Sequence, residues 1–263
     1  MSILISSTSN PKVKDIVQLL TKSRVRKSKG LCVIEGEREI QRALASKWIP
    51  SEIWMLDGSS VAIDSSCFPD VYVASQKVFD KIAYRSTTEW AIAVFHTPDV
   101  SLEASKDVLD RAKAVLILEG IEKPGNLGAV LRSAVAVGID AVLLANPAID
   151  PFGPNVIRNA TGALFEIPLF VGDSKTIQGH LKMHSFESYI THMHSESSSM
   201  YDIKWSSKTA LILGEESRGL TMEWTEKGYH NIIIPMEGTS IDSLNVSVAA
   251  AVLMYQWKGS LLV

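Results

Sequence analysis

Three loops hold the residues whose types and spacing could do chemistry. The first runs from Glu119 to Arg132, follows an aliphatic run, and combines glycines with Asn126 and Arg132. Glycines let a backbone turn tightly or approach a ligand closely. Asn126 stands where a helix N-cap is expected. Arg132 falls about 140° round the following helix from Leu127, off its apolar side, so it is either an ordinary exposed arginine or a functional one.

The other two loops also follow aliphatic runs. One of them, Gly214–Gly219, holds two adjacent acids between two glycines. It is not a phosphate-binding P-loop, because no Lys-Ser/Thr follows the second glycine. The last loop breaks an apolar run at Pro235 and enters a helix at Ser243-Leu-Asn245, where Ser243 is a candidate N-cap. Each loop alone is also compatible with a structural role, as a charged turn or a capped helix.

The elements that position these loops are typical of a mainly parallel sheet with strands buried on both faces. The expected strands are short and aliphatic: Ala114–Leu118, Ala141–Leu144, Phe165–Phe170, Ala210–Leu213 and Asn231–Ile234. Two helices are expected, Leu127–Val137 and Leu244–Trp257. The second carries one apolar stripe, made of Leu244, Val248, Ala251, Val252 and Tyr255. Open α/β sheets bind ligands at the carboxyl ends of their strands, where the three loops lie.

The first part of the chain predicts a small α/β sandwich. Its expected elements alternate: Lys12–Leu20 (helix), Leu31–Ile34 (strand), Glu37–Ala45 (helix), then strands at Glu52–Leu56, Val71–Val73 and Ala91–Phe95. A polar, acidic stretch that begins at Thr97-Pro98 predicts a linker with room for a helical turn or two. We therefore expect domains at residues 1–98 and 111–263, joined by a linker at 99–110.

Charge is distributed unevenly along the chain. The net charge is −3, yet residues 1–50 hold ten Lys/Arg and four Asp/Glu, so this segment carries +6 and the remainder −9. A basic N-terminal face indicates either nucleic-acid binding or a solvated helix surface. The apolar runs are too short to cross a bilayer, and the first residues lack the apolar core of a signal peptide. We expect a cytoplasmic protein without membrane contact.

Together, the three loops resemble the SpoU (TrmH) family of RNA ribose 2′-O-methyltransferases. The matching segments are Asn126-Leu-Gly-Ala-Val-Leu-Arg132, Leu213-Gly-Glu-Glu-Ser-Arg-Gly-Leu220, and Ile234-Pro-Met with Ser243-Leu-Asn-Val-Ser247. The resemblance covers about residues 111–259. The first domain resembles the RNA-binding domain of the family, shared with kink-turn-binding ribosomal proteins, through Asn10-Pro-Lys12, the Lys22–Lys29 cluster and Val33-Ile-Glu-Gly-Glu-Arg38.

The resemblance implies an α/β fold in which the last part of the sheet threads a loop to form a deep trefoil knot. It implies S-adenosylmethionine as methyl donor, no metal ion, and an active site formed across a homodimer. The implied catalytic cluster is Asn126, Arg132, Glu216, Ser243 and Asn245. The implied cofactor contacts are Gly214, Ile234, Met236 and Leu244. The implied RNA contacts are Lys12, Arg24, Arg26, Lys27 and Arg38.

The implied activity is methylation of a ribose 2′-hydroxyl in structured RNA, and the first domain favours ribosomal RNA. In the family, the arginine matching Arg132 is proposed as the base. An equally physical role is to clamp a phosphate and stabilise the alkoxide, because a guanidinium essentially never loses its proton in proteins. Two departures from the family pattern affect contacts: Glu89-Trp90 replaces a frequent Gln-Gly, and Gly238–Ser243 is one residue longer than in many relatives.

Other functions fit the sequence less well. A tRNA substrate and a non-catalytic RNA-binding protein stay open as alternatives. A nicotinamide enzyme or a Rossmann-type methyltransferase would need GxGxxG, and a hydrolase GxSxG; both motifs are missing from the sequence. His180 and His184 are four residues apart and could ligate zinc on a helix, but their polar surroundings favour surface histidines.

Overall fold

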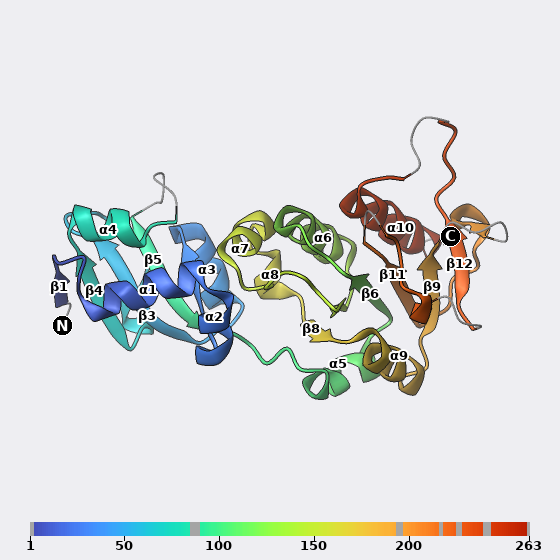
Figure 1. Ribbon diagram of the computed structural model, residues 1–263, viewed down its shortest axis with the longest axis horizontal. Helices are drawn as coiled ribbons and strands as arrows, with labels where there is room; N and C mark the ends of the chain where they lie inside the picture. The colour runs from blue at the N-terminus through green and yellow to red at the C-terminus, as the bar shows by residue number, and fades with distance from the viewer. Residues whose placement is uncertain are drawn as a thin grey trace. The chain divides into compact units, whose positions relative to one another are not determined.

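The computed structural model describes residues 3–84, 90–192, 197–215, 218–224, 228–238 and 243–261. Contacts divide the chain into two compact units (Figure 1). The first unit comprises Met1–Pro98 and Asp150–Phe165, and the second comprises Asp99–Ile149 and Glu166–Val263. A segment from the middle of the sequence therefore belongs with the N-terminal residues.

A mixed sheet of five strands forms the centre of the first unit, in the order β1-β4-β3-β5-β2. Strands β1, β4 and β3 are parallel, and β5 is antiparallel to β3 and β2. The elements are β1 (Ile3–Ile5), α1 (Pro11–Thr21), α2 (Ser23–Lys29), β2 (Leu31–Glu35), α3 (Glu37–Ala45), β3 (Pro50–Leu56), the 3₁₀ turn η1 (Ser65–Cys67), β4 (Asp70–Ala74), α4 (Gln76–Ile82), β5 (Ala91–His96), α7 (Pro154–Ala160) and most of α8 (Ala163–Glu166).

Local sequence explains the first helix and the layers of this unit. Asn10 caps α1 by accepting a hydrogen bond from the Lys12 backbone N–H, and Pro11 suits the first helical position. Helices α1 and α4 share one hydrophobic core with one face of the sheet. Helix α3 packs on β2 and β5. The expected small α/β sandwich is confirmed, with β1, α2 and α4 as additional elements.

The segment Asp150–Phe165 is held in the first unit by two kinds of contact. Arg26 Nε donates to Asp150 Oδ2 at 2.7 Å, with both side chains buried. The Trp48 ring meets the rings of Phe152 and Phe165 edge-on, at centroid distances of 5.8 and 5.0 Å. These contacts fix α7 against the sheet of the first unit.

A parallel sheet of seven strands forms the centre of the second unit, in the order β10-β12-β9-β11-β6-β7-β8. The elements are η2 (Glu103–Ser105), α5 (Lys106–Arg111), β6 (Ala114–Glu119), α6 (Pro124–Val137), β7 (Ala141–Ala145), β8 (Leu169–Gly172), α9 (Ser174–Met183), β9 (Glu187–Thr191), β10 (Ser198–Ser199), η3 (Met200–Asp202), β11 (Thr209–Leu213), η4 (Met222–Trp224), β12 (His230–Ile233) and α10 (Val246–Ser260). The expected mainly parallel sheet is confirmed.

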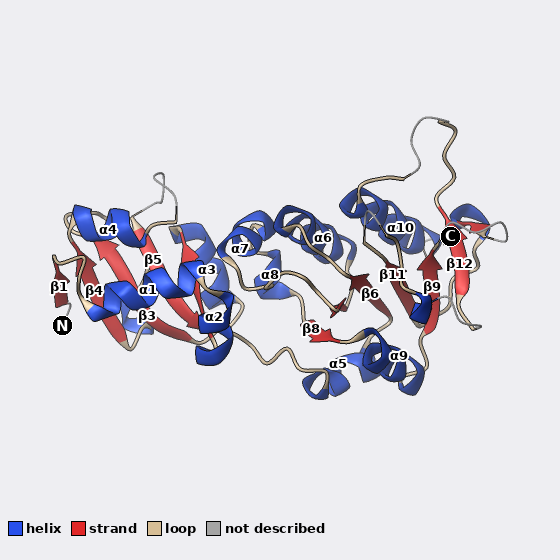
Figure 2. Cartoon of the chain, viewed as in Figure 1, coloured by secondary structure: helices blue, strands red, loops and turns tan. Residues whose placement is uncertain are grey.

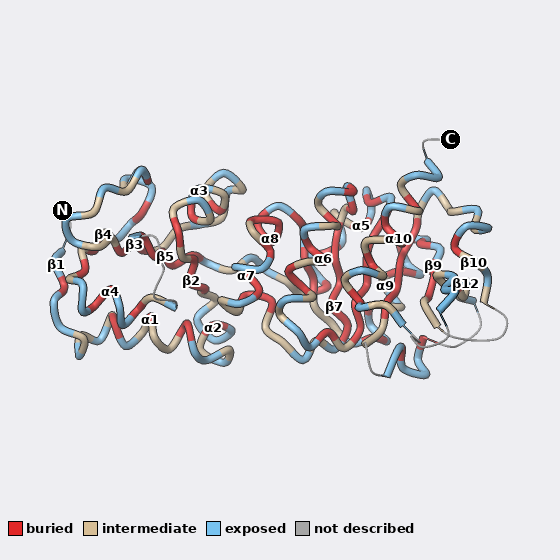
Figure 3. The backbone as a smooth tube through the Cα atoms, turned by 90° about the horizontal axis from the view of Figure 1, so that it is seen from above, coloured by how far each residue is buried: buried red, intermediate tan, exposed pale blue. Residues whose placement is uncertain are grey.

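The central strands of this sheet are buried on both faces, as their aliphatic sequences predict. Every residue of β6, β7 and β11 is buried, and Figure 3 shows red, buried segments gathered around β7. Helices α6 and α10 pack together on one face, and α5 and α9 cover the other (Figure 2).

One expected strand in this unit is wrong in its position. The run Phe165–Phe170 was expected as a single strand, but Phe165 lies in α8 and the strand β8 begins at Leu169. Pro168 has no N–H to donate to a sheet ladder and restricts the residue before it. The strand therefore starts only after the proline.

Helix α10 is apolar on two sides. Its buried side consists of Val246, Ala250, Leu253, Met254 and Trp257. The stripe expected from the sequence lies on the other side, where Val248 is 49% exposed and Tyr255 is 57% exposed. The sequence pattern is present, but the stripe does not face the core of its own chain.

Residues 99–110, expected as a linker, contribute to the core of the second unit. Leu102 and Leu109 are buried in the cluster that also contains Ile177 and Leu181 of α9. None of the described helices is long and apolar enough to span a membrane.

Candidate active site

A cavity of about 180 Å³ lies at the carboxyl ends of two neighbouring strands, β6 and β11. Its lining comes from the turn after β6, the first turn of α6, the loop after β11 and the start of α10: Gly120, Ile121, Glu122, Lys123, Asn126, Gly214, Glu215 and Val246. The three loops singled out in the sequence thus meet at the edge of the sheet where an α/β fold binds ligands.

The loop after β11 is closed so tightly that only glycine fits at its first position. Glu215 and Gly219 exchange two backbone hydrogen bonds of 3.1 and 2.9 Å. A Cβ atom at Gly214 would lie 2.2 Å from the carbonyl carbon of Gly219 and 2.4 Å from the backbone nitrogen of Leu220. Side-chain movement cannot relieve a clash with backbone, so a larger residue would have to reshape the loop.

Asn126 and Asn245 are brought together at this cavity from positions 119 residues apart. The amide nitrogen of Asn245 donates to Oδ1 of Asn126 at 3.3 Å. Asn245 is also the N-cap of α10, because its Oδ1 accepts from the Ser247 backbone N–H at 2.9 Å. The cap engages the amide oxygen of Asn245 and thereby directs its N–H groups towards Asn126.

The two roles of Asn245 can be separated by substitution. Asn245→Asp keeps an oxygen that caps α10 but has no N–H to give Asn126. We expect the free energy of unfolding to stay within about 0.5 kcal/mol of wild type, since aspartate is as good a cap as asparagine. We expect the methyl transfer that the family resemblance implies to fall by on the order of a hundredfold, as when one preorganised donor is lost.

Urea unfolding and single-turnover methyl transfer measure the two effects. Asn245→Ala is the matched variant, because it also loses the cap and should cost about 1 kcal/mol of stability. Wild-type activity in Asn245→Asp would show that Asn245 serves only as a helix cap.

Glu119 is a buried carboxylate beneath the cavity that the sequence did not single out. Its Oε1 accepts from Ser174 Oγ at 2.5 Å, Thr221 Oγ1 at 2.8 Å and Trp224 Nε1 at 2.9 Å, and its Oε2 accepts from Thr221 N at 2.8 Å. These bonds tie the end of β6 to the start of α9 and to the segment that follows Gly219. The signal in the sequence was an acid at the end of a strand whose other residues are all aliphatic.

Arg132 is exposed on α6, as its position off the apolar stripe predicted, while Leu127, Leu131 and Ala134 are buried. It does not line the cavity. Six residues of helix place it roughly 9 Å along the axis and about 120° round from Asn126. In its own chain, Arg132 therefore lies away from the pair of asparagines.

The remaining members of the implied site are not gathered at this cavity. Ser243 is exposed, Leu244 and Ile234 are half-buried, and Met236 is 40% exposed; none of the four lines the cavity. Glu216, Glu89 and residues 239–242 of the longer loop lie outside the described residues.

Asn126 and Ser243 also differ from their expected capping roles. Helix α6 begins at Pro124 with Lys123 as N-cap, so Asn126 is its third residue. Helix α10 begins at Val246 with Asn245 as N-cap, not Ser243. Asn126 therefore lies in the first turn of α6, and Asn245 lies at the N-cap of α10.

Arg26 is a structural residue and not part of an exposed RNA surface. It is 6% exposed, pairs with Asp150, and donates from Nη1 to the carbonyl oxygens of Leu19 and Leu20 at 2.6 and 3.3 Å. A buried guanidinium with these partners is committed to the fold. The charge pattern of the sequence could not reveal a partner 124 residues away.

The other expected RNA contacts lie at the surface of the first unit. Arg24 and Lys27 are exposed on α2. Arg38 is exposed on α3 and donates to Glu39 Oε1 at 2.9 Å. Lys12 pairs with Glu52 at 3.1 Å, and the side-chain hydrogen bond with Tyr72, together with Glu52, raises its pKa above the ordinary lysine value.

The two histidines considered as zinc ligands lie at the end of α9. Their rings stack at a centroid distance of 6.2 Å. His184 is buried, contrary to the surface position expected, and its Nδ1 lies 2.8 Å from Asp110 Oδ1. Within the described residues, no group of three His, Cys, Asp or Glu side chains could hold a metal ion.

Two family models match this chain, one in its N-terminal part and one in its C-terminal part. The model of the SpoU rRNA Methylase family matches residues 113–255, which include the cavity. The MRM3-like substrate binding domain matches residues 10–93.

Relatives match over nearly the whole chain. The 23S rRNA (guanosine(2553)-2′-O)-methyltransferase RlmP of Bacillus subtilis is 33% identical over 97% of this chain and 99% of its own length. A crystal structure of an RNA 2′-O ribose methyltransferase is 33% identical, with a TM-score of 0.81 over 99% of this chain and 100% of that one. The AdoMet-bound rRNA methyltransferase of Sinorhizobium meliloti shares the fold at 24% identity, with a TM-score of 0.86 over 99% of this chain and 98% of its own.

These matches confirm the fold class expected from the resemblance, a SpoU methyltransferase domain with a parallel sheet, preceded by a smaller α/β domain; the trefoil knot that the resemblance implies is consistent with this fold. They cover both the cavity at the ends of β6 and β11 and the unit that precedes it. The chain is a methyltransferase of the SpoU rRNA methylase family.

Proposed function

We propose that this protein transfers a methyl group from S-adenosylmethionine to a ribose 2′-hydroxyl of ribosomal RNA. The observation that carries the proposal is that Asn126 and Gly214 line one cavity, where Asn126 accepts a hydrogen bond from Asn245. The three residues come from the three motifs that resemble the family. RlmP, a relative of similar length, is a 23S rRNA (guanosine(2553)-2′-O)-methyltransferase.

The cavity has features that suit the methyl donor. Gly214 itself presents only backbone to the cavity, and the loop has no room for a side chain at that position. Glu122, Glu215 and Lys123 line the cavity, so its charged side chains carry a net negative charge, which favours a sulfonium cation. Its volume of about 180 Å³ lies below that of pockets that enclose a drug-sized ligand, so only part of the donor would be enclosed.

When bound, S-adenosylmethionine supplies a methyl group already activated by its sulfonium. The residues of the chain must then align the 2′-oxygen with the S–CH₃ bond and accept the charge that develops as the hydroxyl proton leaves. Alignment alone can contribute roughly 7–11 kcal/mol. We assign alignment to the Asn126–Asn245 pair and charge stabilisation to Arg132. No step of this chemistry calls for a metal ion.

We further propose that the active protein is a homodimer in which Arg132 of one chain serves the cavity of the other. Two observations support a shared site. Arg132 lies away from the cavity of its own chain, and α10 exposes the apolar stripe that includes Val248 and Tyr255. Helices that are apolar all round are normally covered, and a second copy would cover this one.

For the RNA surface we propose Arg24, Lys27, Arg38 and Lys12, and we leave Arg26 out. Arg24 and Lys27 project from the same short helix α2, within the segment matched as a substrate binding domain. Exposed cations of this kind contact phosphates and give affinity without sequence preference. Because ribosomal RNA is the proposed substrate, we retain a cytoplasmic location as part of the proposal.

Methylation assays on 23S rRNA and tRNA transcribed in vitro, with EDTA present, test the proposed substrate. We expect methyl transfer to 23S rRNA and none to tRNA. RNA affinity should fall steeply with salt, because each phosphate contact releases counterions. The double variant Arg24→Ala, Lys27→Ala should reduce the slope of log K against log[salt] by about two.

Sedimentation of the wild-type protein in the same buffers checks the dimer. Transfer to tRNA alone would replace ribosomal RNA as the substrate, and binding without transfer to either RNA would indicate a non-catalytic RNA-binding protein. A slope unchanged in the double variant would show that α2 is only solvated surface. A monomer at active concentrations would exclude the shared site.

A further inference from the structure

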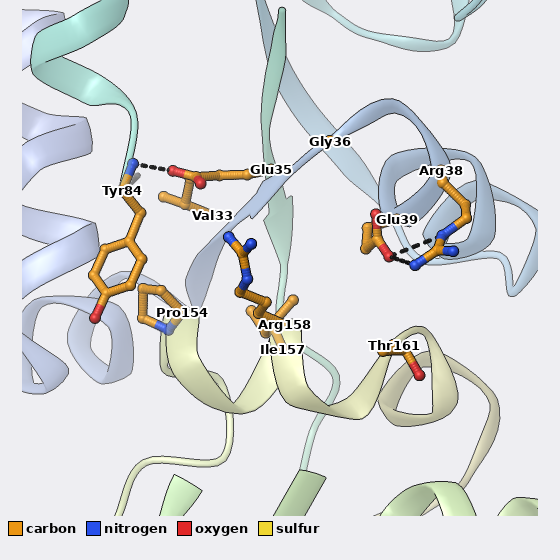
Figure 4. A pocket seen from close by; sticks show the side chains of 10 residues that line it. All are labelled: Val33, Glu35, Gly36, Arg38, Glu39, Tyr84, Pro154, Ile157, Arg158 and Thr161. Atoms are coloured by element: carbon orange, nitrogen blue, oxygen red, sulfur yellow. Dashed lines mark hydrogen bonds and ion pairs between the residues drawn. The ribbon is translucent and has the colours of Figure 1, made fainter. Parts of the chain in front are cut away.

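The first unit contains a second cavity, of about 270 Å³, between the turn that joins β2 to α3 and the helix α7 (Figure 4). We call it the α7 pocket. Its walls include Glu35 and Gly36 of the turn, Glu39 of α3, Tyr84, and Arg158 of α7. All its lining residues belong to the first unit, although α7 comes from the part of the sequence matched by the methylase family.

Arg158 is the basic side chain that this pocket leaves unsatisfied. It is exposed, its guanidinium points into the pocket in Figure 4, and it forms no hydrogen bond or ion pair with the described residues. The two carboxylates of the lining already have partners. Glu35 accepts from the Tyr84 backbone N–H, and Glu39 accepts from Arg38 Nε and Nη2 at 3.2 and 2.9 Å.

The helix that carries Arg158 is fixed by packing. The buried pair of Arg26 and Asp150 anchors the chain just before α7. The ring of Trp48 contacts Phe152, which precedes α7 in the sequence, and Phe165, which follows it. Within α7, Val156 and Ile157 are buried. The backbone that carries Arg158 is therefore held in place, and binding a ligand would have to order only the side chain itself.

Tyr84 gives the pocket an aromatic face beside this cation. Its side chain is 38% exposed and lies across the pocket from α3 in Figure 4. Proteins recognise unstacked nucleotides by stacking bases on aromatic rings and by binding phosphates with arginine. The volume lies just below the range of pockets for drug-sized ligands, which suits one nucleotide.

We propose that the α7 pocket receives one unstacked nucleotide of the RNA substrate, with Arg158 on its phosphate and the Tyr84 ring against its base. The proposal rests on the proposed function for the identity of the RNA. It makes α7 part of the RNA-binding surface of the first unit, beyond the segment matched as a substrate binding domain.

Binding of 23S rRNA transcribed in vitro, measured over a range of salt concentrations, tests the pocket. Arg158→Ala should lower RNA affinity and reduce the slope of log K against log[salt] by about 0.7, the value for one phosphate of a single strand. Arg158→Lys should retain most of the slope, because the charge is kept. Tyr84→Leu should weaken binding about fivefold or more with an unchanged slope, and Tyr84→Phe should bind as wild type.

Arg111→Ala is the matched control, because Arg111 is an exposed arginine on α5 of the second unit. Affinity for S-adenosylmethionine and the transfer rate at saturating RNA should be unchanged in every variant. An Arg158→Ala variant that matches Arg111→Ala in affinity and slope would overturn the proposal. If wild type methylates 23S rRNA in that experiment, only the pocket is disproved; if wild type methylates no RNA, the proposed function fails instead.

Discussion

Gly214→Ala should weaken binding of S-adenosylmethionine by on the order of a hundredfold. The added Cβ would lie 2.2–2.4 Å from backbone atoms of Gly219 and Leu220, so the loop can accept it only by moving apart. Overpacking of this kind costs about 1–3 kcal/mol, and 2.8 kcal/mol corresponds to a hundredfold in affinity. Gly214→Trp would in addition fill the cavity and should abolish binding. Titration calorimetry with S-adenosylmethionine measures both effects.

Gly179→Ala is the control for this substitution. Gly179 lies within α9, and no atom lies within 4 Å of a Cβ placed there. Alanine also favours a helix over glycine, so this variant should keep wild-type affinity and slightly higher stability. Circular dichroism shows whether Gly214→Ala keeps its secondary structure. Wild-type affinity in Gly214→Ala would remove the loop after β11 from the donor site.

Arg132→Ala should lower methyl transfer by on the order of a hundredfold or more while changing stability by no more than about 0.5 kcal/mol. The stability estimate follows from the exposure of Arg132 on α6. The catalytic estimate follows from its proposed role, in which the planar guanidinium holds a phosphate and stabilises the alkoxide. Single-turnover transfer and urea unfolding measure the two quantities, with Arg111→Ala as the control for an exposed arginine.

Arg132→Lys separates the two roles considered for this residue. A lysine keeps the positive charge but loses the planar fork, so a clamp should retain part of its activity at neutral pH. A base behaves differently, because only neutral lysine can accept a proton. In that case the activity of the lysine variant should rise as pH approaches the lysine pKa of about 10.4. Full activity in Arg132→Ala would remove the residue from the mechanism.

The sequence predicted most strands of the second unit because their burial on both faces leaves a simple aliphatic signature. Strands β9 (Glu187–Thr191) and β10 (Ser198–Ser199) were missed, since neither carries an aliphatic run. The start of β8 was misplaced because Pro168 interrupts an apolar run that otherwise continues from Phe165. Both kinds of error arise where the local residue types do not match the element that they form.

The sequence could not show which residues of the site contact each other, because the partners lie far apart along the chain. Asn126 and Asn245 were identified separately, but their hydrogen bond depends on how α10 packs on α6. Arg26 looked like its neighbours Arg24 and Lys27, and only the position of Asp150 shows that it is buried. The stripe on α10 was read correctly as apolar, yet periodicity does not say which of two apolar sides faces the core.

The most direct test of the site is to locate the transferred methyl group. Wild type, Gly214→Ala and Asn245→Asp would each be given S-adenosylmethionine labelled in its methyl group and 23S rRNA, and the RNA digested to nucleosides for mass spectrometry. The cavity at the ends of β6 and β11 predicts one ribose-methylated nucleoside from wild type and at least tenfold less from either variant. Label on a base, or equal labelling by all three proteins, would contradict the assignment of ribose methylation to this cavity.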